Sequence, residues 1–93
     1  MEKEDLVVDL QSHFGLTEDH LTIDFKKDKT ISITYDLNGY ELKRPPNLDS
    51  FWEKLQGLSS SQAREINSES KEITVNRQEL ESLLSQLGPP IQA

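Results

Sequence analysis

The chain has 93 residues, enough for one small domain. It contains no cysteine, so disulfide bonds, thiolate catalysis and cysteine-based metal sites are excluded. Its 17 acidic and 10 basic residues give a net charge of −7 at pH 7. This sign disfavours nucleic acid and anionic membranes as direct partners, because binding to phosphates needs clustered lysine and arginine.

The charge is unevenly distributed along the chain. Residues 1–24 contain seven acids and one base, residues 25–44 three acids and five bases, and residues 45–93 seven acids and four bases. The acidic N-terminal sequence shows no apolar leader segment, and the longest apolar run, Leu6-Val7-Val8, is far too short to cross a membrane. We therefore expect a cytoplasmic protein with one domain over residues 1–88.

The first predicted element is an amphipathic helix over residues 2–14. Leu6, Leu10 and Phe14 recur at intervals of four residues, so they share one helix face. Gly15 is expected to end this helix, because glycine readily adopts the left-handed conformation found at helix termini. A polar turn then leads into the first strand.

The central prediction is a three-stranded antiparallel meander over about residues 21–44. Apolar and polar side chains alternate along its first two strands, and successive residues of a strand point to opposite faces. Keeping the apolar faces in phase places Phe25 opposite Ile31 and Ile23 opposite Ile33.

The third strand of the predicted meander depends on the Asn38-Gly39 dipeptide. This pair is the strongest short hairpin signal, because a type I′ turn needs a positive φ at both central residues. A two-residue turn there pairs a strand over residues 40–44 with the second strand. Pro45-Pro46 then ends the third strand, since proline has no amide hydrogen to donate.

A second helix is predicted to begin at Asn47 or Asp49. Phe51 and Leu55 lie on its apolar face, and Trp52 is expected to pack on the sheet rather than to meet a partner. Tyr40, in the predicted third strand, remains a candidate aromatic contact for a partner.

The next segment, residues 59–72, is polar and rich in serine. We predict a mobile loop there, with a short capped turn as the alternative, because Ser59 and Gln62 have capping-box spacing. A short strand is expected over residues 72–75, either joining the sheet edge or lying in extended form beside it. At the other end of the chain, residues 89–93 follow a predicted helix stop and are expected to be a frayed tail.

The last helix has the clearest local signals in the chain. Asn76 is its predicted N-cap, Glu79 occupies the third helical position of a capping box, and Val75 is placed to contact Leu80. The apolar stripe consists of four leucines, and Gly88 with the following prolines ends the helix. The expected order is thus helix, three strands, helix, loop, strand, helix, a two-layer α+β domain with helices on one face of the sheet.

Catalytic and cofactor signals are weak. The sequence has no glycine-rich phosphate loop, nucleophile elbow or zinc-protease motif. His13 and His20 lie near Glu18 and Asp19, but their spacing matches no established metal site. The acids are expected on solvated helix faces, without the burial that separates the pKa values of a catalytic pair. We therefore predict no enzyme activity, no metal and no cofactor.

Five cations form one predicted basic cluster on the hairpins, Lys26, Lys27, Lys29, Lys43 and Arg44. The expected helix, three strands and helix follow the order of double-stranded RNA-binding domains, which carry a lysine-rich motif at the start of the helix after the sheet. Here residues 47–50 are Asn-Leu-Asp-Ser, so we predict no RNA binding. The lysines are expected to keep the hairpin soluble and to protect an edge strand.

These features favour a small acidic, non-enzymatic interaction module that acts as an inhibitor or regulator and presents carboxylates to a basic, nucleic-acid-binding protein surface. The predicted order with acidic flanks is broadly similar to some small phage-encoded inhibitor proteins, at the level of fold alone. The candidate contact acids are Glu2, Glu4, Asp5, Asp9, Glu18 and Asp19. The alternative is an assembly protein, possible as a homodimer, that self-associates through its sheet face or its C-terminal helix.

Overall fold

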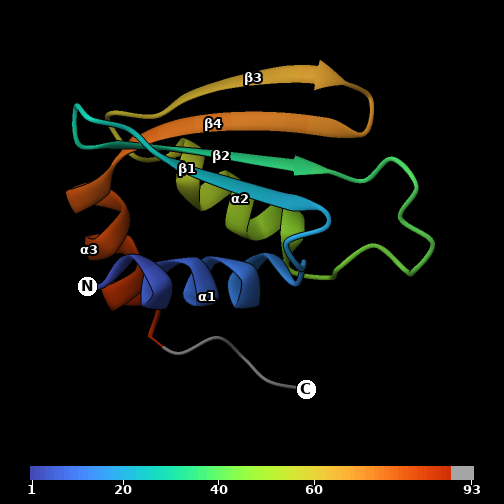
Figure 1. Ribbon diagram of the computed structural model, residues 1–93, viewed down its shortest axis with the longest axis horizontal. Helices are drawn as coiled ribbons and strands as arrows, with labels where there is room; N and C mark the ends of the chain where they lie inside the picture. Colours follow the sequence, from blue (N-terminus) through green and yellow to red (C-terminus); the bar gives the residue numbers. More distant parts are fainter. Residues whose placement is uncertain (89–93) are drawn as a thin grey trace.

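The computed structural model describes residues 1–88, which form three helices and a four-stranded sheet. The elements are α1 (Lys3–Phe14), β1 (Leu21–Phe25), β2 (Thr30–Asp36), α2 (Leu48–Gln56), β3 (Gln62–Asn67), β4 (Ser70–Asn76) and α3 (Arg77–Leu87). All three helices lie on one face of the sheet (Figure 1), which confirms the two-layer α+β class. The tail predicted at residues 89–93 lies outside the described residues.

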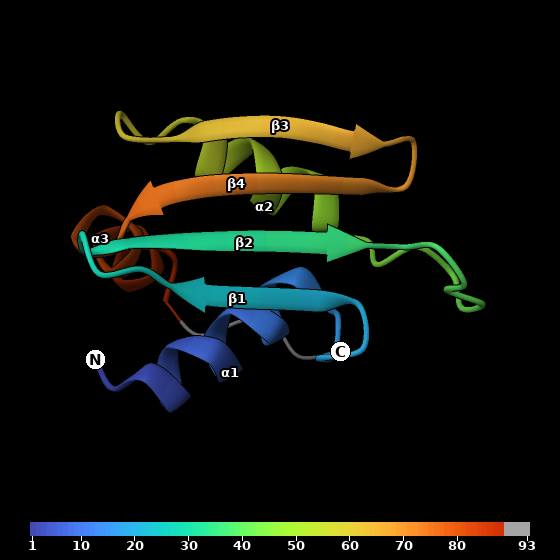
Figure 2. The same cartoon turned by 45° about the horizontal axis from the view of Figure 1, so that its top comes forward.

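The sheet is antiparallel throughout, with the strand order β1-β2-β4-β3 (Figure 2). The predicted register of the first hairpin is confirmed, because Phe25 pairs with Ile31 and Ile23 with Ile33. The apolar inward residues of β2 and β4 are buried, and the inward Lys71 at the start of β4 is partly buried. The other face carries Ser, Thr, Asp and Glu and is not covered by a helix (Figure 1).

The predicted third strand at residues 40–44 is wrong. Residues 37–47 instead project beyond the end of the sheet as an irregular excursion (Figure 1). β4 occupies the place beside β2 and brings Ile73 and Val75 into full burial, whereas the excursion leaves Leu42 75% exposed. Pairing of β2 with the distant β4 is therefore preferred over the local hairpin predicted at Asn38-Gly39, because it buries more apolar surface.

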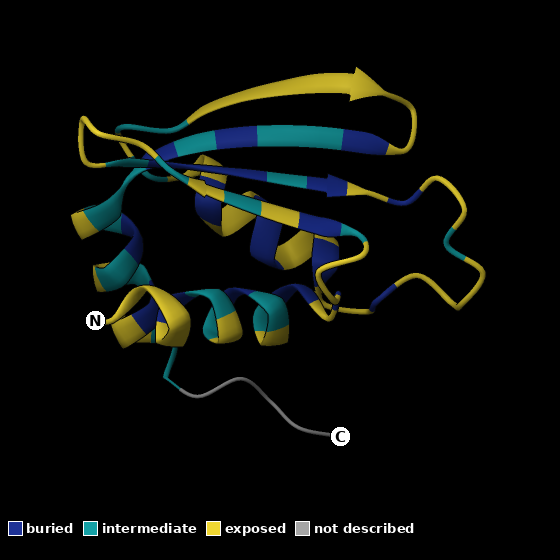
Figure 3. Cartoon of the chain, viewed as in Figure 1, coloured by how far each residue is buried: buried dark blue, intermediate teal, exposed yellow. Residues whose placement is uncertain are grey.

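The prediction of a loop without secondary structure at residues 59–72 is also wrong. β3 and the start of β4 form a hairpin there, with a bulge between Glu65 and Asn67. All six residues of β3 are exposed (Figure 3), so this edge strand lacks the alternation by which strands are recognised in a sequence. The strand predicted at 72–75 is confirmed as part of β4, but its predicted place at or beside the sheet edge is wrong, because β4 lies between β2 and β3.

Both predicted endings of α1 and α3 are confirmed. Gly15 has a φ of 73°, and the backbone N–H groups of Gly15 and Leu16 both donate to the Gln11 carbonyl oxygen, at 2.8 and 3.2 Å. Gly88, with a φ of 72°, follows α3, and its N–H donates to the Leu84 carbonyl oxygen.

The N-terminus of α3 is capped by Asn76, whose side-chain oxygen accepts from the backbone N–H groups of Gln78 and Glu79 at 2.9 and 3.3 Å. The predicted capping box does not close directly, because the Asn76 N–H donates to Ser60 and not to Glu79. Ser60 Oγ accepts from the Asn76 N–H at 2.9 Å and donates to the Glu79 carboxylate at 2.8 Å. A serine from the preceding segment therefore links the two ends of the box.

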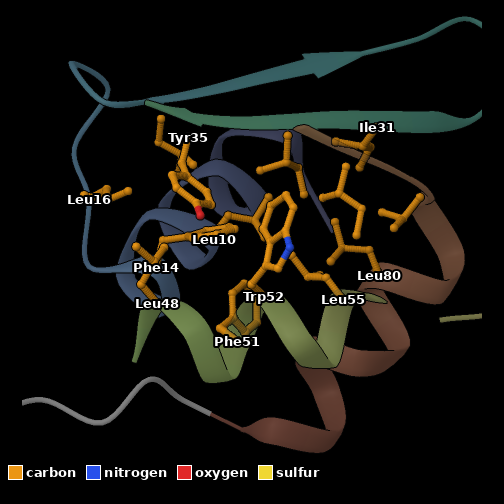
Figure 4. Close-up of a cluster of buried hydrophobic side chains, with 14 of the residues drawn as sticks. Leu10, Phe14, Leu16, Ile31, Tyr35, Leu48, Phe51, Trp52, Leu55 and Leu80 are labelled. Carbon is orange, nitrogen blue, oxygen red and sulfur yellow. The ribbon is translucent and has the colours of Figure 1, made fainter. Parts of the chain in front are cut away.

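Aliphatic side chains and four aromatic rings fill the space between the sheet and the helices (Figure 4). Trp52 is 5% exposed, and its ring meets Tyr35 edge-on with centroids 5.2 Å apart, so its predicted place in the core is confirmed. Phe14 and Phe51 form a second perpendicular pair at 5.0 Å. The leucines of α3 also belong to this core, either buried or packed against it.

Candidate functional site

The acidic residues of α1 lie on the side of the helix that faces away from the core. Leu6, Leu10 and Phe14 form the buried stripe. Glu4 and Asp5 project on the exposed side, as the helical repeat of 3.6 residues requires. Val8 lies among the acids of this side and is 60% exposed. Asp9 is half-buried and follows Asp5 by one turn.

The six predicted contact acids form two groups rather than one cluster. Glu2, Glu4, Asp5 and Asp9 lie on or just before α1. Glu18 and Asp19 are exposed in the turn after its C-terminal end. Glu2 and Glu4 lie at its start, about 18 Å away along a helix of 12 residues that rises about 1.5 Å per residue. The ion pairs found within residues 1–88 use Asp24, Asp49, Glu72 and Glu81 as their acids, so all six candidates retain unneutralised carboxylates.

A hollow of about 400 Å³ lies beside the turn that holds Asp19, between that turn and the 37–47 excursion. Tyr40 and Leu42 supply its apolar wall, and Glu41 adds an acid. The His20 ring meets the Tyr40 ring edge-on at 4.9 Å, and its Nδ1 lies 2.8 Å from the Asp36 carbonyl oxygen. The sequence identified Tyr40 as a possible contact but placed Leu42 in a strand, so this apolar wall was missed.

The two histidines do not share a site. His13 stacks on Phe51 with ring centroids 4.9 Å apart, while His20 packs against Tyr40. Partial burial lowers the pKa of His13 from its usual value, and the nearby Asp9 carboxylate opposes that shift. In the part of the chain that the structure describes, no three His, Asp or Glu side chains are grouped so that they could hold a metal ion.

The uncovered sheet face contains a polar cluster centred on Glu72. Its carboxylate accepts hydrogen bonds from Ser32 Oγ at 3.2 Å, Thr34 Oγ1 at 3.3 Å and Arg64 Nε at 2.7 Å. The Arg64 bond is the main cause that lowers the pKa of Glu72, and burial opposes it. Because these groups satisfy one another, we interpret the cluster as a cross-strand support of the sheet.

The predicted basic cluster is divided by the structure. Lys26, Lys27 and Lys29 lie at the β1–β2 turn, whereas Lys43 and Arg44 lie in the excursion at the opposite end of the sheet (Figure 1). Arg44 is also paired there with Asp49 at 2.7 Å.

No family model, curated protein or solved structure matches the chain. The candidate site is therefore interpreted from its own geometry and charge. Among the helices of residues 1–88, none combines the length and the apolar character needed to cross a membrane.

Proposed function

We propose that this chain is a small acidic, non-enzymatic interaction module that binds a basic protein surface and acts as an inhibitor or regulator. The observation that carries the proposal is the state of the acids on α1. Glu4 and Asp5 are exposed, Asp9 is half-buried, and none of the three forms an ion pair among the described residues. The fold leaves these charges available for a partner's cations.

Apolar side chains beside the acids support a protein partner rather than a small cation. Val8 is 60% exposed among the carboxylates of α1, and Leu42 is 75% exposed beside the 18–19 turn. Interfaces combine a few such anchors with charges that steer the encounter and fix the orientation. A partner surface with lysines and arginines around an apolar patch, as on nucleic-acid-binding proteins, complements this arrangement.

The test compares two triple variants that change the net charge equally. The site variant carries Glu4→Gln, Asp5→Asn and Asp9→Asn. The control carries Glu53→Gln, Glu65→Gln and Glu69→Gln, three exposed acids on α2 and the β3–β4 hairpin. Both variants and the unmodified chain are used to capture proteins from a nuclease-treated lysate of the source cells, and each captured protein is then titrated in purified form.

The expected result is a basic protein that binds the unmodified chain and the control but binds the site variant about threefold to a hundredfold more weakly. This range follows from about 0.2–1 kcal/mol for each exposed charge pair. Rising salt should weaken binding of the unmodified chain more than that of the site variant, because screening acts on the lost pairs. Equal binding by both triple variants would reject the proposal. The cytoplasmic location expected from the sequence stays a prediction, and fractionation of the source cells tests it.

A further inference from the structure

Cations from three distant parts of the sequence meet at one end of this acidic molecule. The amino-terminal residues, the β1–β2 turn and the start of α3 come together at the left of Figure 1. They surround a hollow of about 350 Å³. Its charged lining consists of the cations Lys3, Lys26, Lys27, Lys29 and Arg77 and the acid Glu81. The lining therefore has a large excess of positive charge, although the whole chain has a net charge of −7.

Phe25 holds two of these cations in place. The Lys3 ammonium lies 5.4 Å from the centroid of the Phe25 ring, and the Arg77 guanidinium carbon lies 5.3 Å from it. A ring attracts a cation through its quadrupole and does not neutralise the charge. Arg77 is further fixed by Glu81 at 3.2 Å and by the Met1 carbonyl oxygen at 2.6 Å. The hollow thus contains a guanidinium with a restricted position.

Lys29 occupies a position where glycine is the relaxed choice. Its φ is 67°, in the left-handed region that a lysine rarely adopts. The Lys29 carbonyl oxygen accepts from the Arg77 N–H at 2.9 Å, which ties the turn to α3. Backbone strain of this kind concentrates at ligand-binding sites, and here the strained residue directs a charged side chain to the lining of the hollow.

Two acids lie in or beside the turn, and neither lines the hollow. Asp24 pairs with Lys26 at 3.2 Å, whereas Asp28 accepts from the Thr30 hydroxyl at 2.6 Å and keeps its negative charge. Lys27 and Lys29 take part in no ion pair within residues 1–88. The first N–H groups of α3 are bound to Asn76 and Lys29, so a ligand in the hollow meets side chains rather than the helix terminus.

We propose that this hollow binds a phosphate group, carried either by inorganic phosphate or by a phosphate monoester. A compact anion with more than one charge matches a lining with several excess positive charges. Lysine ammonium groups bind phosphate as point charges, and the fixed Arg77 guanidinium offers the N–H donors that Glu81 and the Met1 carbonyl oxygen leave free. The hollow adjoins the acidic interaction surface at the start of α1 through Lys3, but its other cations come from the β1–β2 turn and α3. Variants of Lys29 therefore test the hollow without changing any of the proposed contact acids.

The test is a nuclear magnetic resonance titration of the ¹⁵N-labelled chain at constant ionic strength. The separate arms are inorganic phosphate, phenyl phosphate, sodium chloride and a ten-residue oligothymidine. Lys29→Gly and Lys29→Gln both remove the cation, but the glycine relaxes the left-handed strain and the glutamine retains it. Lys29→Arg keeps a cation at this position. Lys43→Gln, in the distant excursion, is the matched control.

We expect saturable shifts of residues 25–30 and 77–78 with phosphate or phenyl phosphate. The dissociation constant should be on the order of 10 mM, because three exposed charge pairs contribute up to about 1 kcal/mol each. Both charge-removing variants should weaken binding about threefold or more, whichever way their stabilities change, while Lys29→Arg and Lys43→Gln bind as the unmodified chain does. Inorganic phosphate and phenyl phosphate are compared to identify the preferred source of the phosphate group. The proposal would be overturned if chloride produced the same shifts, or if only oligothymidine produced them. It would also be overturned if the shifts depended on protein concentration alone, or if loss of the Lys29 charge left them unchanged.

Discussion

His13 is the residue whose protonation the fold opposes. Burial against α2 lowers its pKa below the usual 6.5, although Asp9 pulls in the other direction. The unfolded state therefore binds more protons near neutral pH, so this contribution to stability is present above pH 6.5 and falls as the pH drops through the folded pKa. We expect urea unfolding to show lower stability at pH 5.5 than at pH 7.5, and His13→Phe to reduce that difference. An undiminished difference in His13→Phe would contradict the assignment.

The left-handed conformation of Lys29 should also affect the stability of the fold. Replacing it with glycine relieves the left-handed strain but gives the unfolded chain more freedom, so Lys29→Gly should stabilise the fold by about 1 kcal/mol or less. Lys27→Gly in the same turn relieves no such strain and should destabilise the fold. Urea unfolding at pH 7 measures both. A similar loss of stability in the two variants would show that the conformation of Lys29 carries no cost.

At the level of elements, Ser60 couples the segment before β3 to the start of α3. Its hydroxyl bridges the Asn76 N–H and the Glu79 carboxylate. Ser60→Ala leaves both groups without this partner, and we expect a loss of about 1–2 kcal/mol in the free energy of unfolding. Ser68→Ala, in the exposed β3–β4 turn, should change it by less than about 0.5 kcal/mol. If urea unfolding gave the same loss of stability for both substitutions, the Ser60 hydroxyl would not contribute to the cap of α3.

The elements that the sequence predicted correctly rest on local signals or on a short hairpin. The ends of α1 and α3 follow from Gly15, Asn76 and Gly88, and the β1–β2 register follows from the parity of apolar residues. The strand that pairs with β2 is not determined by local sequence, because residues 40–44 compete for this position with a strand about thirty residues further along the chain. The outcome of that competition depends on how much surface each alternative buries, which no short window of sequence contains.

At the level of the whole molecule, the two charged surfaces differ in how far the sequence could predict them. The acids of α1 follow one another on one helix, so composition and helical period were enough to find them. The basic hollow joins Lys3, the β1–β2 turn and Arg77, which lie far apart in the chain. The sequence instead grouped the turn lysines with Lys43 and Arg44, because the third strand was expected to place them on one sheet.

The oligomeric state separates an interaction module from an assembly protein. The leucines of α3 are used in the core, and the exposed edge strand β3 carries the charges of Arg64 and Glu65 and a bulge, features that oppose edge-to-edge pairing. We therefore expect light scattering to give the monomer mass at about 0.15 M salt, where exposed charges are screened beyond about 8 Å. Ile66, 48% exposed at the bulge, is the apolar residue of β3 most able to support a dimer. A dimer that forms with rising concentration and is abolished by Ile66→Lys, but not by Lys43→Gln, would show self-assembly through the β3 edge instead.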